Sequence, residues 1–81
     1  MSRVEVDAIV ESYAGYKGEE TPRAVVLGGR RFAVVRVLSR ERTLDPADGS
    51  RREVWRCRLD DGRTVSVALL ETGAWRACLE S

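Results

Sequence analysis

Apolar and polar residues alternate with a period of two along most of this chain, which is the period of a β-strand with one buried face. Between Arg3 and Val10 every second residue is apolar, and this strand is expected to continue toward Tyr13. No segment keeps a helical period over the length of a helix, although one or two helical turns between Ala68 and Gly73 remain an alternative. The pattern predicts six short strands, at residues 3–10, 24–27, 31–42, 51–59, 63–69 and 74–79.

Glycine and aspartate mark the tight connections between these strands. Gly28 and Gly29 predict a two-residue hairpin turn, because such turns require positive φ angles that glycine adopts without strain. Asp60, Asp61 and Gly62 predict a second hairpin turn, and the adjacent acids are interpreted as turn residues rather than as catalytic carboxylates. The other connections are expected at residues 14–23, 43–50 and 71–73.

The predicted strands differ in which of their faces are apolar. In strand 51–59, Trp55, Cys57 and Leu59 face inward and the arginines face outward, and Trp75 falls at another inward position. Strand 31–42 is apolar on both faces in its middle, as expected of a strand buried on both sides at the bend of a small barrel. We therefore predict one all-β domain over residues 1–81, a small, six-stranded, SH3-like barrel that is partly open.

Length and hydropathy exclude several classes of protein. A chain of 81 residues has room for one compact core. Its apolar runs are far shorter than the roughly 20 residues of a membrane span. The charged N-terminus lacks the apolar stretch of a signal peptide, so we expect a cytoplasmic protein that does not bind membranes.

The residues needed for catalysis or metal binding are scarce. Without histidine, the chain lacks the commonest general base and a frequent zinc ligand. Cys57 and Cys78 are too far apart for a C-x-x-C motif and are expected to be buried thiols, with a disulfide between neighbouring strands as the alternative. The acids around Gly49 lack the spacing of a calcium loop. We expect no enzyme, no metal and no cofactor.

Arginine is concentrated in the middle of the chain. Nine of the thirteen arginines lie between Arg30 and Arg58, so this segment carries a net charge of +5, whereas residues 1–29 and 59–81 each carry −2. Outward guanidinium groups can bind phosphates or carboxylates through paired hydrogen bonds. The alternative is that they pair across strands with Glu41 and Glu53 on a solvated face. The candidate contact face comprises Arg30, Arg31, Arg40, Arg42, Arg51, Arg52, Arg56 and Arg58.

A second candidate surface surrounds the loop at residues 14–23. Loops on a rigid barrel often carry binding residues, and this loop offers Tyr13, Tyr16, Glu20 and Arg23. The alternative is a solvent-facing connection in which Pro22 fixes the start of the next strand.

Parts of the chain together resemble a small bacterial β-domain family of unknown function. The matching stretches are Tyr13 to Arg23 (YAGYKGEETPR), Leu27 to Leu38 (LGGRRFAVVRVL) and Leu59 to Arg63 (LDDGR), with Trp75 following. A similar module stands at the C-terminus of some actinobacterial Y-family DNA-polymerase-like repair proteins. The resemblance implies a compact β domain that acts in DNA-damage tolerance as an adaptor for partner proteins or DNA, and it brings no catalytic residues.

The sequence thus predicts a non-enzymatic binding or adaptor module that binds nucleic acid or an acidic protein, including a repair protein, through its arginine-rich hairpin. Reversing Arg52 and Arg56 to glutamate should then abolish binding and leave the melting temperature nearly unchanged. The alternative is a structural domain that self-associates through an edge strand, for which Ala74 to Leu79 is the candidate. The chain is expected to be a monomer or a weak homodimer.

Overall fold

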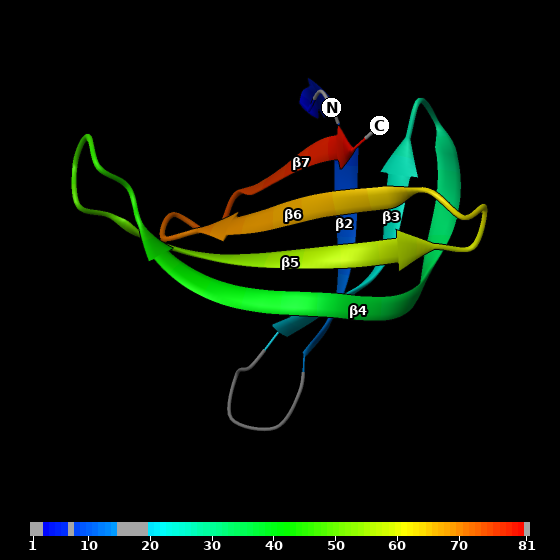
Figure 1. The fold of residues 1–81 in the computed structure, drawn as a ribbon, viewed down its shortest axis with the longest axis horizontal. Helices are drawn as coiled ribbons and strands as arrows, with labels where there is room; N and C mark the ends of the chain where they lie inside the picture. Colours follow the sequence, from blue (N-terminus) through cyan, green and yellow to red (C-terminus); the bar gives the residue numbers. More distant parts are fainter. Residues whose placement is uncertain (1–2, 7, 15–19, 81) are drawn as a thin grey trace.

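A computed structural model of the chain describes residues 3–6, 8–14 and 20–80, and every regular element within them is a β-strand (Figure 1). None of the described residues forms a helix able to cross a membrane. The all-β prediction is confirmed, and the helical alternative is wrong because a strand extends to Leu70 before the next turn. The strands are β1 (Arg3–Val6), β2 (Ala8–Ala14), β3 (Glu20–Leu27), β4 (Arg30–Leu44), β5 (Arg51–Leu59), β6 (Thr64–Leu70) and β7 (Trp75–Glu80).

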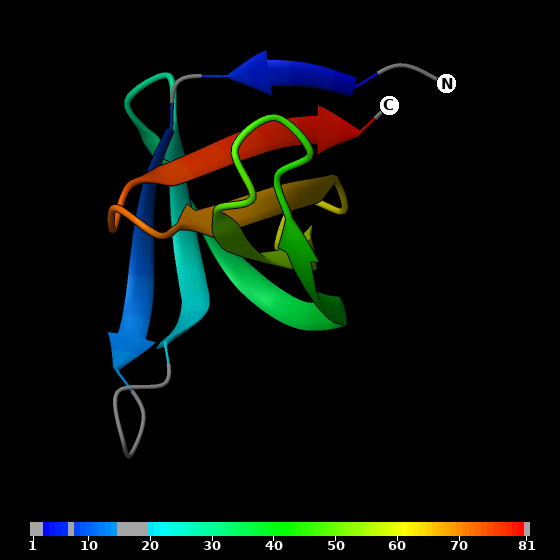
Figure 2. The ribbon, with the colours of Figure 1, turned by 90° about the vertical axis from the view of Figure 1, so that its left-hand side faces the viewer.

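The strands form one antiparallel sheet in the order β1-β7-β6-β5-β4-β3-β2. β1 and β2 follow each other in the chain, yet β1 pairs with β7 at one end of this order and β2 pairs with β3 at the other. The sheet therefore curls until its ends approach each other (Figure 2). This is the predicted partly open, SH3-like barrel, and the expected first strand appears as two pieces, β1 and β2.

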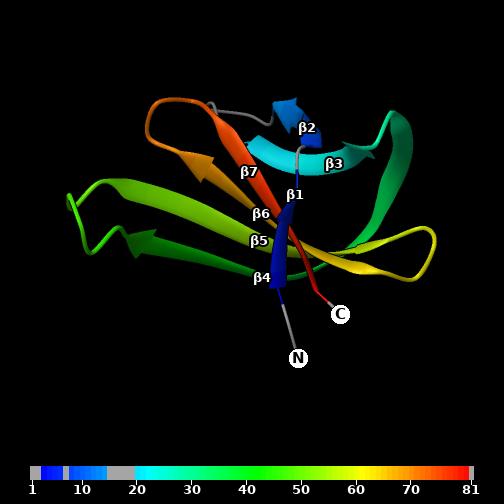
Figure 3. The ribbon, with the colours of Figure 1, turned by 90° about the horizontal axis from the view of Figure 1, so that it is seen from above.

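β4 connects the two parts of the barrel, the β2–β3 hairpin and the layer that β4 itself forms with β5 and β6. Its first residues, Arg30 to Ala33, pair with β3, and from Val34 onward it pairs with β5. β2 and β3 cross one face of the layer formed by β4, β5 and β6, and the far end of the β4–β5 hairpin projects beyond them (Figure 3). The predicted hairpin turn between β3 and β4 is confirmed, because Gly28 and Gly29 have φ angles of 57° and 79°.

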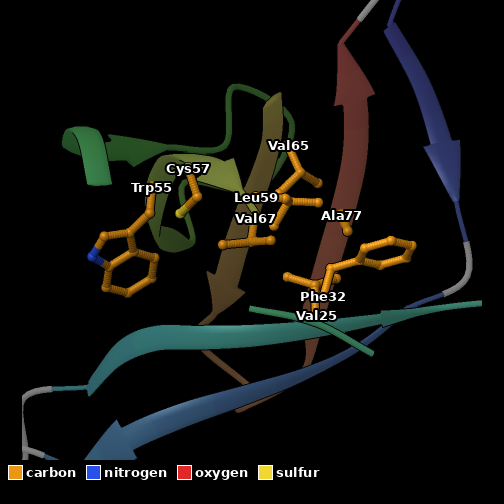
Figure 4. Packing of buried hydrophobic residues seen from close by; sticks show 8 residues of the cluster. All are labelled: Val25, Phe32, Trp55, Cys57, Leu59, Val65, Val67 and Ala77. Atoms are coloured by element: carbon orange, nitrogen blue, oxygen red, sulfur yellow. The ribbon is translucent and has the colours of Figure 1, made fainter. Parts of the chain in front are cut away.

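The core fills the space between the two parts of the barrel (Figure 4). Trp55 is 1% exposed, and Trp75 packs on it with the ring centroids 5.4 Å apart. Full burial of each large apolar side chain contributes about 1.5–3 kcal/mol, so these few residues provide much of the stability of a small domain. The inward positions predicted for β5, Trp55, Cys57 and Leu59, are confirmed. The buried cluster comprises Val25, Phe32, Trp55, Cys57, Leu59, Val65, Val67 and Ala77.

Two predictions about strand environment are wrong. β4 is not buried on both faces, because Val35 and Val37 are 61% and 40% exposed. The ladder with β3 stops at Ala33, so no described strand covers this part of β4. β3 also begins at Glu20, inside the predicted loop. Pro22 is tolerated there because this part of β3 pairs only with β2, next to a register shift, so the missing N–H breaks no central ladder.

Candidate binding surface

The two faces of the β4–β5 hairpin are set by strand register. On β5, Trp55, Cys57 and Leu59 point into the core, so the alternating residues Arg56 and Arg58 point outward. Directly paired residues lie on the same face of an antiparallel sheet. The partners on β4 therefore show to which face each of its arginines belongs.

Two β-bulges place Arg36 on the outer face. Register shifts occur between Val34 and Arg36 and again between Val37 and Ser39, leaving one residue unpaired at each place. Simple alternation from the inward Val34 would turn Arg36 inward. The first bulge shifts the inward–outward alternation by one residue, so that Arg36 points outward, and the second bulge shifts it back. Arg36 consequently lies directly opposite Arg58.

The arginines on the outer face differ in the groups that their guanidinium groups contact. Arg56 binds Glu80 at 2.9 Å, and this carboxylate raises the pKa of the guanidinium. Arg52 binds Asp45 at 2.6 Å. Arg58 instead donates a hydrogen bond to the main-chain oxygen of Gly62 at 3.2 Å. Neither Arg36 nor Arg58 forms an ion pair with any described residue.

Arg40 and Arg42 lie on the opposite face from these residues. They pair with Trp55 and Glu53, whose side chains belong to the core side of β5. Both guanidinium groups bind the carboxylate of Glu53, at 2.9 Å and 3.1 Å, and that of Arg40 also lies 5.7 Å from the centre of the Trp55 ring. One carboxylate therefore serves two arginines, and Arg40 helps to cover the core.

The other members of the predicted arginine face lie at the ends of the hairpin. Arg31 binds Glu11 on β2 at 2.8 Å, and this hydrogen bond lowers the pKa of the carboxyl group. Arg30 lies over the ring of Phe32, 5.5 Å from its centre. At the other end Arg51 is exposed, and among the described residues only its main-chain N–H, not its guanidinium group, donates to a carboxylate. The eight predicted arginines thus occupy both faces and both ends of the hairpin.

The predicted cross-strand pairing is found for only one of the two acids. Glu53 binds arginines of β4, whereas Glu41 is exposed and forms no ion pair with a described residue. Charge reversal of Arg52 and Arg56 is not a clean test of binding, because new carboxylates would then face Asp45 and Glu80. Arg36 and Arg58 are the better probes.

The second candidate surface is described only in part. Tyr16 lies outside the described residues, as do the side chains of Tyr13 and Glu20, whose main chains belong to the β2–β3 ladder. Arg23 is exposed, beside the register shift of β3. Nothing in the described part of the chain brings Arg23 near the outer face of the hairpin.

The longest free sheet edge found among the described strands belongs to β4. From Val34 to Leu44 this strand pairs only with β5. The proposed edge at Ala74 to Leu79 is wrong, because β7 lies between β6 and β1. The predicted strand lengths already contained a signal: a partner of four residues at 24–27 is too short to cover a strand running from 31 to 42.

An open groove of about 770 Å³ lies on the outer face of β5, β6 and β7. Its floor includes the small side chains of Ser66, Ala68 and Cys78, and Arg52 borders it. The Nε atom of Arg52 is buried without a hydrogen-bond partner. Charges of both signs surround the groove, and no group of potential metal ligands occurs among the described residues.

The two thiols are free and lie on opposite faces of the sheet. Cys57 is fully buried, as predicted, and burial raises its pKa to about 11, which keeps it protonated at neutral pH. Cys78 pairs with Ser66 on the outer face and is only partly buried, so the prediction that both thiols are buried fails for this residue.

The acidic residues of the predicted turns stabilise these turns by accepting main-chain hydrogen bonds. Asp45 and Asp48 accept hydrogen bonds from the main-chain N–H groups of Ala47 and Ser50, both at 2.8 Å. Asp61 likewise accepts from the N–H of Arg63. Comparison of the chain with protein-family models, curated proteins and solved structures finds no match.

Proposed function

We propose that this protein is a non-enzymatic binding module that holds an acidic segment of a partner protein through the β4–β5 hairpin. The observation that carries the proposal is the direct opposition of Arg36 and Arg58 on the outer face, where neither has a carboxylate partner among the described residues. Like charges directly opposite on a sheet are destabilising. A bound carboxylate would remove this repulsion and accept charge-assisted hydrogen bonds from both guanidinium groups.

Two features favour an acidic protein over nucleic acid. Carboxylates stand among the arginines of the hairpin, including the exposed Glu41, and they would repel a continuous phosphate backbone. Trp55 is 1% exposed, so the only tryptophan of the hairpin offers no open ring on which bases could stack. The resemblance noted in the sequence suggests repair proteins as the first partners to test.

The proposal is tested with a fluorescent peptide that alternates glutamate and valine, titrated at roughly 50 and 200 mM salt, because screening weakens contacts between exposed charges. We expect binding that weakens at the higher salt and is lost in the double variant Arg36→Glu and Arg58→Glu. The matched control is Arg23→Glu, another exposed arginine with no ion pair among the described residues.

The outcomes separate the candidate surfaces. Loss of binding in Arg23→Glu, with binding retained in the double variant, would move the site to the β2–β3 loop. Binding of single-stranded or double-stranded oligonucleotides in preference to the peptide would overturn the choice of an acidic protein and favour the nucleic-acid hypothesis.

A further inference from the structure

The free edge of β4 has the geometry to accept another strand. From Ser39 to Leu44 its register with β5 is continuous, without bulges. The opposite side of these residues pairs with no described strand. Such an edge presents N–H and C=O groups in the spacing that an added strand needs.

Exposed apolar side chains lie at both ends of this regular stretch. Val35, Val37 and Leu38 are 61%, 40% and 38% exposed, and Leu44 at the far end is 65% exposed. Isolated exposed apolar residues are common on protein surfaces, but these lie along one unpaired edge. An added strand could therefore gain apolar contacts as well as main-chain hydrogen bonds.

Charge along the edge selects the kind of strand that can bind. Arg36 has no ion pair among the described residues, and Arg40 and Arg42 share the single carboxylate of Glu53. Even with Glu41 on the same strand, these three arginines outnumber the two acids. The edge is therefore positively charged and complementary to an acidic segment.

The same charges disfavour pairing between two copies of the chain. An edge-to-edge dimer through β4 would bring Arg36, Arg40 and Arg42 of each copy toward those of the other. Bulges and positive charges on an edge are established means by which proteins avoid such pairing. The two bulges of β4 act in this way beside its regular stretch.

We infer that an extended, acidic segment of a partner protein adds to the sheet as a strand along Ser39 to Leu44 of β4, with its apolar residues against the exposed side chains at the two ends. This inference rests on the proposed function and specifies how the acidic partner is held. Main-chain hydrogen bonds provide affinity, and the arginines provide selectivity for acidic side chains.

The experiment compares the alternating glutamate and valine peptide with a second peptide of the same sequence in which alternate main-chain nitrogens are methylated. Methylation preserves charge but removes the N–H donors that strand addition requires. We expect the methylated peptide to lose at least about tenfold in affinity, the effect of roughly 1.4 kcal/mol. The unmethylated peptide should slow hydrogen exchange of the amides within residues 39–44.

A gain-of-affinity variant gives an independent measurement. Glu53→Gln leaves Arg40 and Arg42 without their shared carboxylate, so both become available to the peptide. We expect affinity to rise about two- to fivefold, the effect of one exposed ion pair. The control Glu71→Gln removes an exposed acid whose one hydrogen bond within the described part of the chain is to the main chain of Arg51, and it should leave affinity unchanged.

The outcomes distinguish this inference from the proposed function. Equal binding of both peptides, without added amide protection, would overturn strand addition and leave the arginine-mediated function standing. Absence of binding by either peptide would contradict both. A concentration-dependent mass without peptide, together with protection of residues 39–44, would show that a second copy occupies the edge and would also overturn the inference.

Discussion

β4 and β5 are neighbours in one hairpin, yet they occupy different environments. β5 buries Trp55, Cys57 and Leu59 almost completely, whereas β4 buries no residue after Phe32. Both strands carry apolar residues in their middle. The difference arises because β5 lies between β4 and β6, whereas β4 loses its second neighbour after Ala33. Apolar character alone therefore does not determine burial at the edge of a sheet.

The same difference separates stability from binding. The arginines near the barrel core are engaged: Arg31 with Glu11, and Arg40 with Glu53 and the Trp55 ring. Arg36 and Arg58 lie on the outer face without carboxylate partners among the described residues. We expect substitutions at the inward positions of β5 to affect folding, and substitutions of Arg58 and of the exposed part of β4 to affect mainly binding.

The largest expected effect is on the β5 side. Trp55→Ala should lower the free energy of unfolding by about 3–5 kcal/mol, because it removes a buried aromatic side chain and leaves a cavity beside Trp75. Urea denaturation followed by circular dichroism measures this change. A loss below about 1 kcal/mol would show that this ring is not a core anchor.

Thiol reactivity compares the two faces of the sheet within one molecule. Cys57 is buried and Cys78 is partly exposed on the outer face, so Cys78 should react with a thiol reagent first. Cys57 reacts only when the core opens, and we expect its rate to be at least about a hundredfold lower. Mass spectrometry of the Cys78→Ser variant measures the slow thiol. Similar rates for both cysteines would contradict the buried position of Cys57.

Acid should destabilise the protein through carboxyl groups outside the β4–β5 ladder. Hydrogen bonding lowers the pKa of Glu11 through Arg31, and of Asp48 and Asp61 through main-chain N–H groups. A pKa that is lower in the folded state stabilises the protein above the unfolded value, and this contribution is lost as pH falls through the folded value. The melting temperature should therefore decrease as the pH is lowered below about 4.5.

The matched variant for acid denaturation is Glu11→Gln, which removes one of these titrating groups and the charge of its ion pair with Arg31. Its melting temperature should depend less on pH in this range than that of the wild type. An unchanged pH dependence would show that the Glu11–Arg31 pair makes no contribution in solution.

The smallest expected effect is on the exposed part of β4. Leu38→Ser should change the free energy of unfolding by no more than about 0.5 kcal/mol, because this side chain lies at a bulge and is 38% exposed. The same urea experiment used for Trp55→Ala measures it. A loss above about 2 kcal/mol would show that this part of β4 is covered in solution.

Much of the barrel could be predicted because its signals are local. Alternation identified the inward positions of Trp55 and Cys57, and two glycines identified the β3–β4 turn. The early start of β3 was missed because Pro22 usually interrupts a strand, and only the one-sided pairing there allows it. Such pairing depends on the tertiary arrangement and leaves no local signal.

The candidate site was predicted only in its composition. The sequence located the arginines but not their division between two faces, because two unpredicted bulges determine the side to which Arg36 points. The sequence also did not show that Glu53 forms ion pairs with two arginines, whereas Arg36 and Arg58 form none with a described carboxylate. A bulge depends on both strands of a pair, and alternation within one strand does not reveal it.

The most direct test of the central claim maps the peptide onto the protein by nuclear magnetic resonance. The alternating glutamate and valine peptide is titrated into isotope-labelled protein, and the shift of each main-chain amide is measured. We predict that the largest shifts fall within residues 34–44 of β4 and at Arg58, with little change around Arg23. Shifts concentrated on β2 and β3, or no shifts at saturating peptide, would contradict the assignment of binding to the β4–β5 hairpin.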